Sequence, residues 1–255
     1  MNGSAFGYFF VLINITLLPN ISAQSGKEQT HDFLVGSSLE TTFEAYEEKV
    51  GRGAHIFNGH EYVPLKGMII IGHEFFLTEY LEPGDIVYEG NFYRDIEMLY
   101  DCHKDEILIA HYSQRGRLVK IRINKDKVEE FRFMGHYFKH LRDKNVATLN
   151  FPGSGFYDLL YDNGKNGTRL LVKRIKGFQD RIEEKKLIGE FEQKDRFYII
   201  KNNTYERVRK KKSLLKVFED KKKEIKSYVK KQKLDFKRDQ ENAILQIVKF
   251  YDQSF

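Results

Sequence analysis

The chain has 255 residues and a mass of 30.2 kDa, enough for one substantial domain with a sizeable core. It carries 21 Phe and 15 Tyr but no Trp, and this bias towards residues that prefer strands favours a β-rich fold. Only four Pro and a mixed charge pattern argue against wholesale disorder, and the single cysteine excludes an intramolecular disulfide.

The N-terminus reads as an export signal. No Lys, Arg, Asp or Glu occurs before Lys27, and the stretch from Phe6 to Leu18 is almost continuously apolar. Small Ala23 then offers a cleavage site before Gln24. This order predicts a signal peptide over residues 1–23 and an exported protein of the periplasm or cell surface, without a transmembrane span in the mature chain. The alternative is a buried N-terminal element.

Residues 24–54 are expected to form a loose segment, in which Leu39 to Val50 could make one short helix. From His55 onwards, short apolar runs are separated by Gly and Asn. Turn signals that tolerate positive φ recur between such runs, and each predicts a β-hairpin. They are Asn58-Gly59, Glu89-Gly90-Asn91, Met134-Gly135-His136 and Asn202-Asn203.

Alternating residues support antiparallel strands. Val119, Ile121 and Ile123 interleave with Lys120 and Arg122, so one face of that strand is apolar and the other polar. Leu-Tyr-Asp occurs at residues 99–101 and again at residues 160–162, each time before a polar turn and an aliphatic run. In both places the Asp is suited to accept hydrogen bonds from its own turn. Residues 55–208 are therefore expected to form an antiparallel meander, curved or partly closed, in an α+β, mainly β fold.

The last 47 residues, 209–255, predict a basic helical tail. Helices are expected from Leu214 to Phe218, from Lys221 to Gln232 after an Asp220 cap, and from Gln240 to Tyr251 after an Asp239 cap. Residues 209–238 hold 14 Lys or Arg against 4 Asp or Glu, a local net charge of +10. At least part of the tail should pack on the sheet, because an isolated helix of about 12 residues is marginal in water.

The basic tail is the one candidate binding site. It could contact an anionic lipid or lipopolysaccharide surface, or an envelope protein, although a solvated face of packed helices is the simpler interpretation. Nucleic acid is not expected, since no binding motif is present. The residues predicted to bind the anionic surface are Lys210, Lys211, Lys212, Lys221, Lys222, Lys223, Lys230 and Lys231.

No catalytic, cofactor-binding or metal-binding residue is predicted. Cys102 is expected to be a packed thiol, and His136 and His140 share a face without completing a ligand set. Gly153-Ser154-Gly155 lacks the spacing of a nucleophile elbow. The function that these observations favour is non-enzymatic binding or a structural role; the alternatives are a carrier of an apolar ligand within the curved sheet and a hydrolase without a recognised motif.

Three segments of the chain carry a resemblance to known sequences. They run from Phe57 to Pro64, from Leu99 through Asp101 to Leu108, and from Lys221 through Lys226 to Asp252. These segments resemble a family of exported Bacteroidota proteins that carries no assigned activity. The resemblance covers most of the chain from about His55 to the end. It implies a periplasmic or cell-surface setting and transfers no catalytic role.

Overall fold

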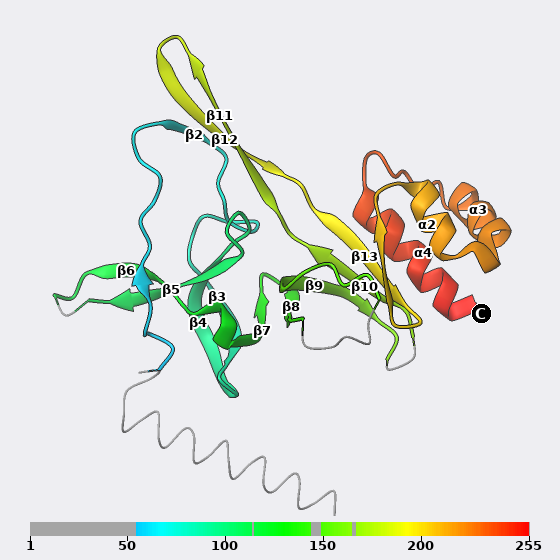
Figure 1. The fold of residues 1–255 in the computed structure, drawn as a ribbon, viewed down its shortest axis with the longest axis horizontal. Coiled ribbons are helices and arrows are strands. Elements are labelled where there is room, and N and C mark those ends of the chain that lie inside the picture. The colour runs from blue at the N-terminus through cyan, green and yellow to red at the C-terminus, as the bar shows by residue number, and fades with distance from the viewer. Residues whose placement is uncertain (1–54, 114, 144–148, 165–166, 255) are drawn as a thin grey trace, which may run out of the picture. The chain divides into compact units, whose positions relative to one another are not determined.

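In a computed structural model, residues 55–113, 115–143, 149–164 and 167–254 are described (Figure 1). They belong to one compact unit, Gly53–Phe255. The predicted signal peptide, the loose segment 24–54 and its short helix lie outside the described residues.

The fold is built on an open sheet of eleven strands, all paired antiparallel, in the order β1-β6-β5-β4-β3-β7-β8-β9-β10-β13-β14. The predicted α+β, mainly β class is confirmed, and the sheet does not close. The strands are β1 (His60–Glu61), β3 (Glu82–Tyr88), β4 (Asn91–Asp101), β5 (Glu106–Tyr112), β6 (Leu118–Arg122), β7 (Val128–Phe133), β8 (His136–Leu141), β9 (Gly155–Asp162), β10 (Arg169–Lys173), β13 (Arg196–Lys201) and β14 (Thr204–Val208), and the short 3₁₀ helix η1 (Lys125–Lys127) precedes β7.

Three of the four predicted hairpins are confirmed. Glu89-Gly90, Met134-Gly135 and Asn202-Asn203 each form a two-residue turn in which both residues have positive φ. The two Leu-Tyr-Asp segments also end strands as expected. Asp101 Oδ1 accepts hydrogen bonds from the backbone N–H groups of His103 and Lys104, both at 2.8 Å. Asp162 Oδ1 accepts one from Gly164 N–H at 2.9 Å.

The hairpin predicted at Asn58-Gly59 is wrong. Residues 55–57 form a turn, and β1 pairs instead with β6, where His60 lies opposite Arg122. Gly59 runs so close to that strand that a Cβ would lie 2.2 Å from the Arg122 carbonyl oxygen. The small residue therefore serves a close backbone approach rather than a tight turn.

A second sheet of three strands, in the order β11-β12-β2, was not predicted. The hairpin of β11 (Lys176–Glu183) and β12 (Lys186–Gln193) turns at Glu184-Lys185, where both residues have positive φ. Strand β2 (Ile69–Ile71) pairs with β12 in parallel. Strands β11 and β12 lie between β10 and β13 in the sequence, so their hairpin interrupts the meander, whereas β2 precedes β3.

Two main hydrophobic clusters support the large sheet. The first is rich in aromatic rings that pack on one another; Phe131 and Phe138 stack with centroids 4.5 Å apart, and Tyr100 and Phe156 meet them edge-on. The alternation predicted at Val119, Ile121 and Ile123 is confirmed, because Ile121 and Ile123 are buried in this cluster and Val119 packs against it. The aromatic side chains that suggested an apolar ligand thus supply much of the core themselves.

The second cluster joins the tail to the sheet. Helices α2 (Lys211–Val217), α3 (Lys222–Lys231) and α4 (Gln240–Ser254) follow β14 and lie beside β10 and β13 (Figure 1). Leu170 and Val172 of β10 and Phe197 and Ile199 of β13 are buried with the apolar helix faces. The expectation that the tail packs on the sheet is confirmed.

The predicted helix starts are partly corrected. Asp239 caps α4 as expected, since its Oδ1 accepts the Asn242 N–H at 3.1 Å. Asp220 does not cap α3; it lies in the 3₁₀ turn η2 (Glu219–Lys221), and its carboxylate binds Lys201 and Tyr251 instead. Ser213 lies inside α2, where its Oγ accepts the N–H groups of Arg209 and Lys210.

Candidate functional site

A basic groove is hollowed between α2 and the start of α3. Its volume is about 840 Å³, within the range of small-ligand sites. Seven cationic side chains and one carboxylate line it, together with Ser213 and the apolar Leu215. The charged lining residues are Arg209, Lys210, Lys211, Lys212, Lys216, Lys222, Lys226 and Glu219.

The burial of the apolar helix positions places these lysines at the surface. Leu214 and Leu215 of α2 are buried, as is Phe218 directly after this helix. Ile225 and Val229 of α3 are buried too. Because residues three or four apart share a helix face, the remaining faces carry the charged residues. The side chains of the groove are therefore held by two helices whose other faces are part of the core.

The groove has a large excess of positive charge. Lys222 pairs with Glu219 at 3.2 Å, an exposed pair three residues apart. The other nearby acid, Asp220, is held by Lys201 at 3.1 Å and by the Tyr251 hydroxyl at 2.8 Å. Among the described residues, none forms an ion pair with five of the lining lysines. These are Lys210, Lys211, Lys212, Lys216 and Lys226.

The structure divides the eight predicted lysines into two sets. Lys210, Lys211, Lys212 and Lys222 line the groove, whereas Lys221, Lys223, Lys230 and Lys231 do not. Sequence reasoning missed Arg209, Lys216 and Lys226. The spacing of four residues from Lys212 to Lys216 and from Lys222 to Lys226 is the signal that could have identified two of them.

Helix α4, next to the groove helices, is tied to the sheet by one buried arginine. Arg174, whose side chain is 6% exposed, lies 2.5 Å from Asp158, 2.9 Å from Asp195 and 2.5 Å from Glu241 of α4. Thr168 adds a hydrogen bond from its hydroxyl to Asp252 at 2.9 Å. The apolar cluster joins α2 and α3 to α4 and to the strands, so the groove lysines project from helices that are packed on the sheet.

A second buried charge cluster surrounds Asp105, which the sequence did not single out. Its carboxylate accepts hydrogen bonds from the Tyr100 hydroxyl at 2.7 Å and contacts the ammonium groups of Lys173, at 2.6 Å, and Lys125. Burial by itself would raise the pKa of Asp105, but the two lysines outweigh burial and hold it below its usual range. The cluster joins the β4–β5 turn to β10 and is fully engaged in internal contacts.

The other residues considered from the sequence form no reactive site. Cys102 is 2% exposed, and burial raises the pKa of its thiol well above the usual range, so the nucleophilic thiolate is disfavoured. His136 binds Asp158 at 2.7 Å, while His140 binds the Val128 carbonyl at 2.9 Å. Within the described ranges, no group of three His, Cys, Asp or Glu side chains is placed to hold a metal ion.

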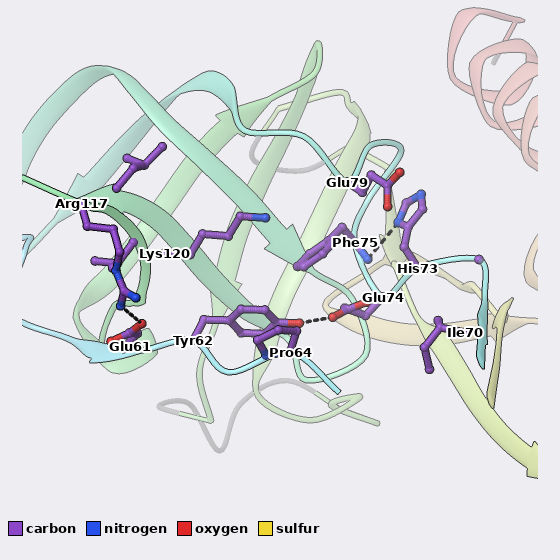
Figure 2. A pocket seen from close by; sticks show the side chains of 13 residues that line it. Glu61, Tyr62, Pro64, Ile70, His73, Glu74, Phe75, Glu79, Arg117 and Lys120 are labelled. Atoms are coloured by element: carbon purple, nitrogen blue, oxygen red, sulfur yellow. Dashed lines mark hydrogen bonds and ion pairs between the residues drawn. The ribbon is translucent and has the colours of Figure 1, made fainter. Parts of the chain in front are cut away.

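A second hollow of about 560 Å³ lies beside β1 and β6 (Figure 2). Its wall includes Tyr62, whose hydroxyl donates to Glu74, and Phe75, whose N–H donates to His73 Nδ1 at 3.2 Å. Arg117 and Glu61 form an exposed ion pair at its rim, 3.0 Å apart. This mixed lining contrasts with the basic groove.

Comparison with known proteins adds no family to these observations. In the part of the chain that is described, no helix has the length and apolar character needed to cross a membrane. No family model, curated protein or solved structure matches the chain.

Proposed function

We propose that this protein is a non-enzymatic binding protein of the cell envelope that attaches to a phosphate-bearing lipid surface through the basic groove. The observation that carries the proposal is the concentration of seven cationic side chains around a single carboxylate, five of them lysines that form no ion pair with any described residue. The envelope setting comes from the export signal expected over residues 1–23.

Clustered lysines are electrostatically unfavourable unless an anion lies among them. Each Lys or Arg near an anionic membrane contributes about 1 kcal/mol to binding, and salt screens this attraction. A lipid surface suits the groove better than nucleic acid does. Its lining holds no aromatic side chain on which a base could stack, whereas Leu215 and the lysine methylenes provide apolar contact.

The test is co-sedimentation of the purified protein with vesicles of phosphatidylcholine alone or of equal parts phosphatidylcholine and phosphatidylglycerol. The groove variant replaces Lys212, Lys216 and Lys226 with Gln. We expect its affinity for the anionic vesicles to fall roughly 100-fold, because three contributions of about 1 kcal/mol are lost. Wild-type binding should also weaken steeply as salt is raised.

The matched control replaces Lys223, Lys230 and Lys231 with Gln. These exposed lysines belong to the same tail, and their loss changes the net charge equally, but they lie outside the groove. The control should lose far less affinity than the groove variant. If the folded groove variant sediments with anionic vesicles as well as the wild type does, the proposal is wrong.

A further inference from the structure

The hollow beside β1 and β6 has the features of a preformed ligand site. Residues on the two legs of the chain that connect β1 to β2 and β2 to β3 line it, and β6 closes a third side. Three contacts fix the wall: Tyr62 N–H donates to the Lys120 carbonyl at 2.8 Å, the Tyr62 hydroxyl donates to Glu74, and Phe75 N–H donates to His73. A volume of about 560 Å³ is typical of small-molecule sites.

An apolar wall runs along this hollow. The Phe75 side chain is buried, and the Tyr62 ring lies with its centroid 6.0 Å from that of Phe75, tilted by 60°. Pro64 lies beside Tyr62 in Figure 2, and Ile70 of β2 adds a further apolar side chain to the lining. Such a surface can accept an aliphatic or aromatic group of a ligand.

Three charged groups of this hollow, Lys120, Glu74 and Glu79, form no ion pair with the described residues. The Glu74 carboxylate already accepts the Tyr62 hydroxyl, which leaves one charge of each sign for a ligand. Lys120 is half-buried; its ammonium lies 5.5 Å from the Phe75 ring centroid, and no carboxylate of the described residues forms an ion pair with it. Glu79 is exposed and makes no ion pair within the described ranges. In the view of Figure 2 the Phe75 side chain lies between these two groups. The remaining rim charges, Arg117 and Glu61, neutralise each other.

We propose that this hollow binds a short apolar peptide with free termini, with its carboxylate at Lys120, its ammonium group at Glu79 and a side chain against Phe75. A simple anion would pair with Lys120 and leave Glu79 without a partner, and a simple cation would do the reverse. A zwitterion satisfies both groups at once. This site is separate from the basic groove and does not depend on lipid binding.

The absence of Trp from the chain allows a direct assay, because a tryptophan-containing peptide that is excited beyond the tyrosine absorption band is observed without tryptophan emission from the protein. The probe is leucyl-tryptophyl-leucine, compared with its N-acetylated form, its C-terminal amide and the doubly blocked peptide. Fluorescence titration should show that the free peptide binds. Each blocking group should lower the affinity about tenfold, because it removes one charged hydrogen bond.

Variants assign each terminus to its partner. Lys120→Met should weaken binding of the free peptide about tenfold and leave the affinity for the C-terminal amide unchanged. Glu79→Gln should also weaken binding of the free peptide about tenfold, but it should leave the affinity for the N-acetylated peptide unchanged. The controls are Lys139→Met, which removes another exposed lysine lying over a tyrosine ring, and Glu97→Gln, which removes an exposed carboxylate elsewhere. Both controls should bind as the wild type does.

The proposal is overturned if the free and doubly blocked peptides bind wild-type protein equally, or if neither binds. It is also overturned if the controls and the site variants lose affinity alike. Thermal melts establish that each variant is folded, so loss of binding is distinguishable from loss of structure.

Discussion

Arg174 is the residue that most directly couples the helices to the sheet. Asp158, its principal partner, is 1% exposed and has one carboxylate oxygen, Oδ1, without a hydrogen bond. The other oxygen, Oδ2, receives Arg174 and His136. Asp158 is therefore held through a single oxygen, where Arg174 supplies the positive charge, and the stability of the fold should be sensitive to the loss of Arg174.

We expect Arg174→Met to lower the free energy of unfolding by about 3–5 kcal/mol, because it leaves buried carboxylates without their cation. The measurement is equilibrium denaturation in urea. Arg181→Met is the matched control. Arg181 also pairs with two carboxylates, Glu183 and Glu190, but its side chain is 42% exposed. Its replacement should cost less than about 1 kcal/mol, as for other surface ion pairs. Equal losses in the two variants would show that burial does not determine the contribution of Arg174.

At the scale of elements, the β11–β12 turn contains local strain. Glu184 and Lys185 have φ values of 48° and 65°, a region that is unfavourable for residues with a side chain. Replacing the pair with Asn-Gly, the preferred sequence for such turns, should stabilise the hairpin by about 1 kcal/mol. Native-state hydrogen exchange of the β11 and β12 amides is the measurement, because the hairpin can open without global unfolding.

The control for this turn is Met134→Asn in the β7–β8 hairpin, where Met134 is exposed. Gly135 already occupies one of its two positive-φ positions, so only one strained residue is replaced and the gain in protection should be smaller. A faster exchange of β11 and β12 in the Asn-Gly variant would contradict the assignment of strain to Glu184 and Lys185.

The same turn shows which elements can be predicted from the sequence. Hairpins with Gly or Asn at positive φ, such as Glu89-Gly90 and Asn202-Asn203, were identified because the residue type reports the backbone conformation. Glu184-Lys185 gives no such signal, and it was missed. Pairings between distant strands, such as β1 with β6 and β2 with β12, depend on tertiary packing, so the sequence does not predict them either.

The candidate site was predictable to a similar degree. The clustering of charge in residues 209–238 indicated that the tail is basic. The groove itself could not be predicted, because its lining comes from α2, η2 and α3 together and depends on how these elements pack. Phe218 is central to this turn, since it is fully buried with its ring 4.4 Å from that of Tyr251 in α4. In the resulting arrangement Lys226 lines the groove, whereas Lys223 and Lys230 do not.

For the whole molecule, the tail is part of the fold and not an appendage to it. Its helices bury apolar side chains of two strands near the end of the sheet, Leu170, Val172, Phe197 and Ile199. Burying such a side chain contributes about 1.5–3 kcal/mol, so four of them amount to roughly 6–12 kcal/mol. That range is comparable with the total stability of a domain, about 5–15 kcal/mol.

A chain that ends at Val208 should therefore lose cooperative folding rather than yield a stable sheet that has merely lost its basic charges. Near-ultraviolet circular dichroism and a thermal melt would report this loss, and binding of a hydrophobic dye would report the exposed strand face. The groove variant with Lys212, Lys216 and Lys226 replaced by Gln should melt like the wild type, because none of these lysines is buried. If the truncated chain melted cooperatively at the wild-type temperature, the helices would contribute charge alone. Neutralising lysines, rather than deleting the tail, is thus the experiment that separates binding from folding.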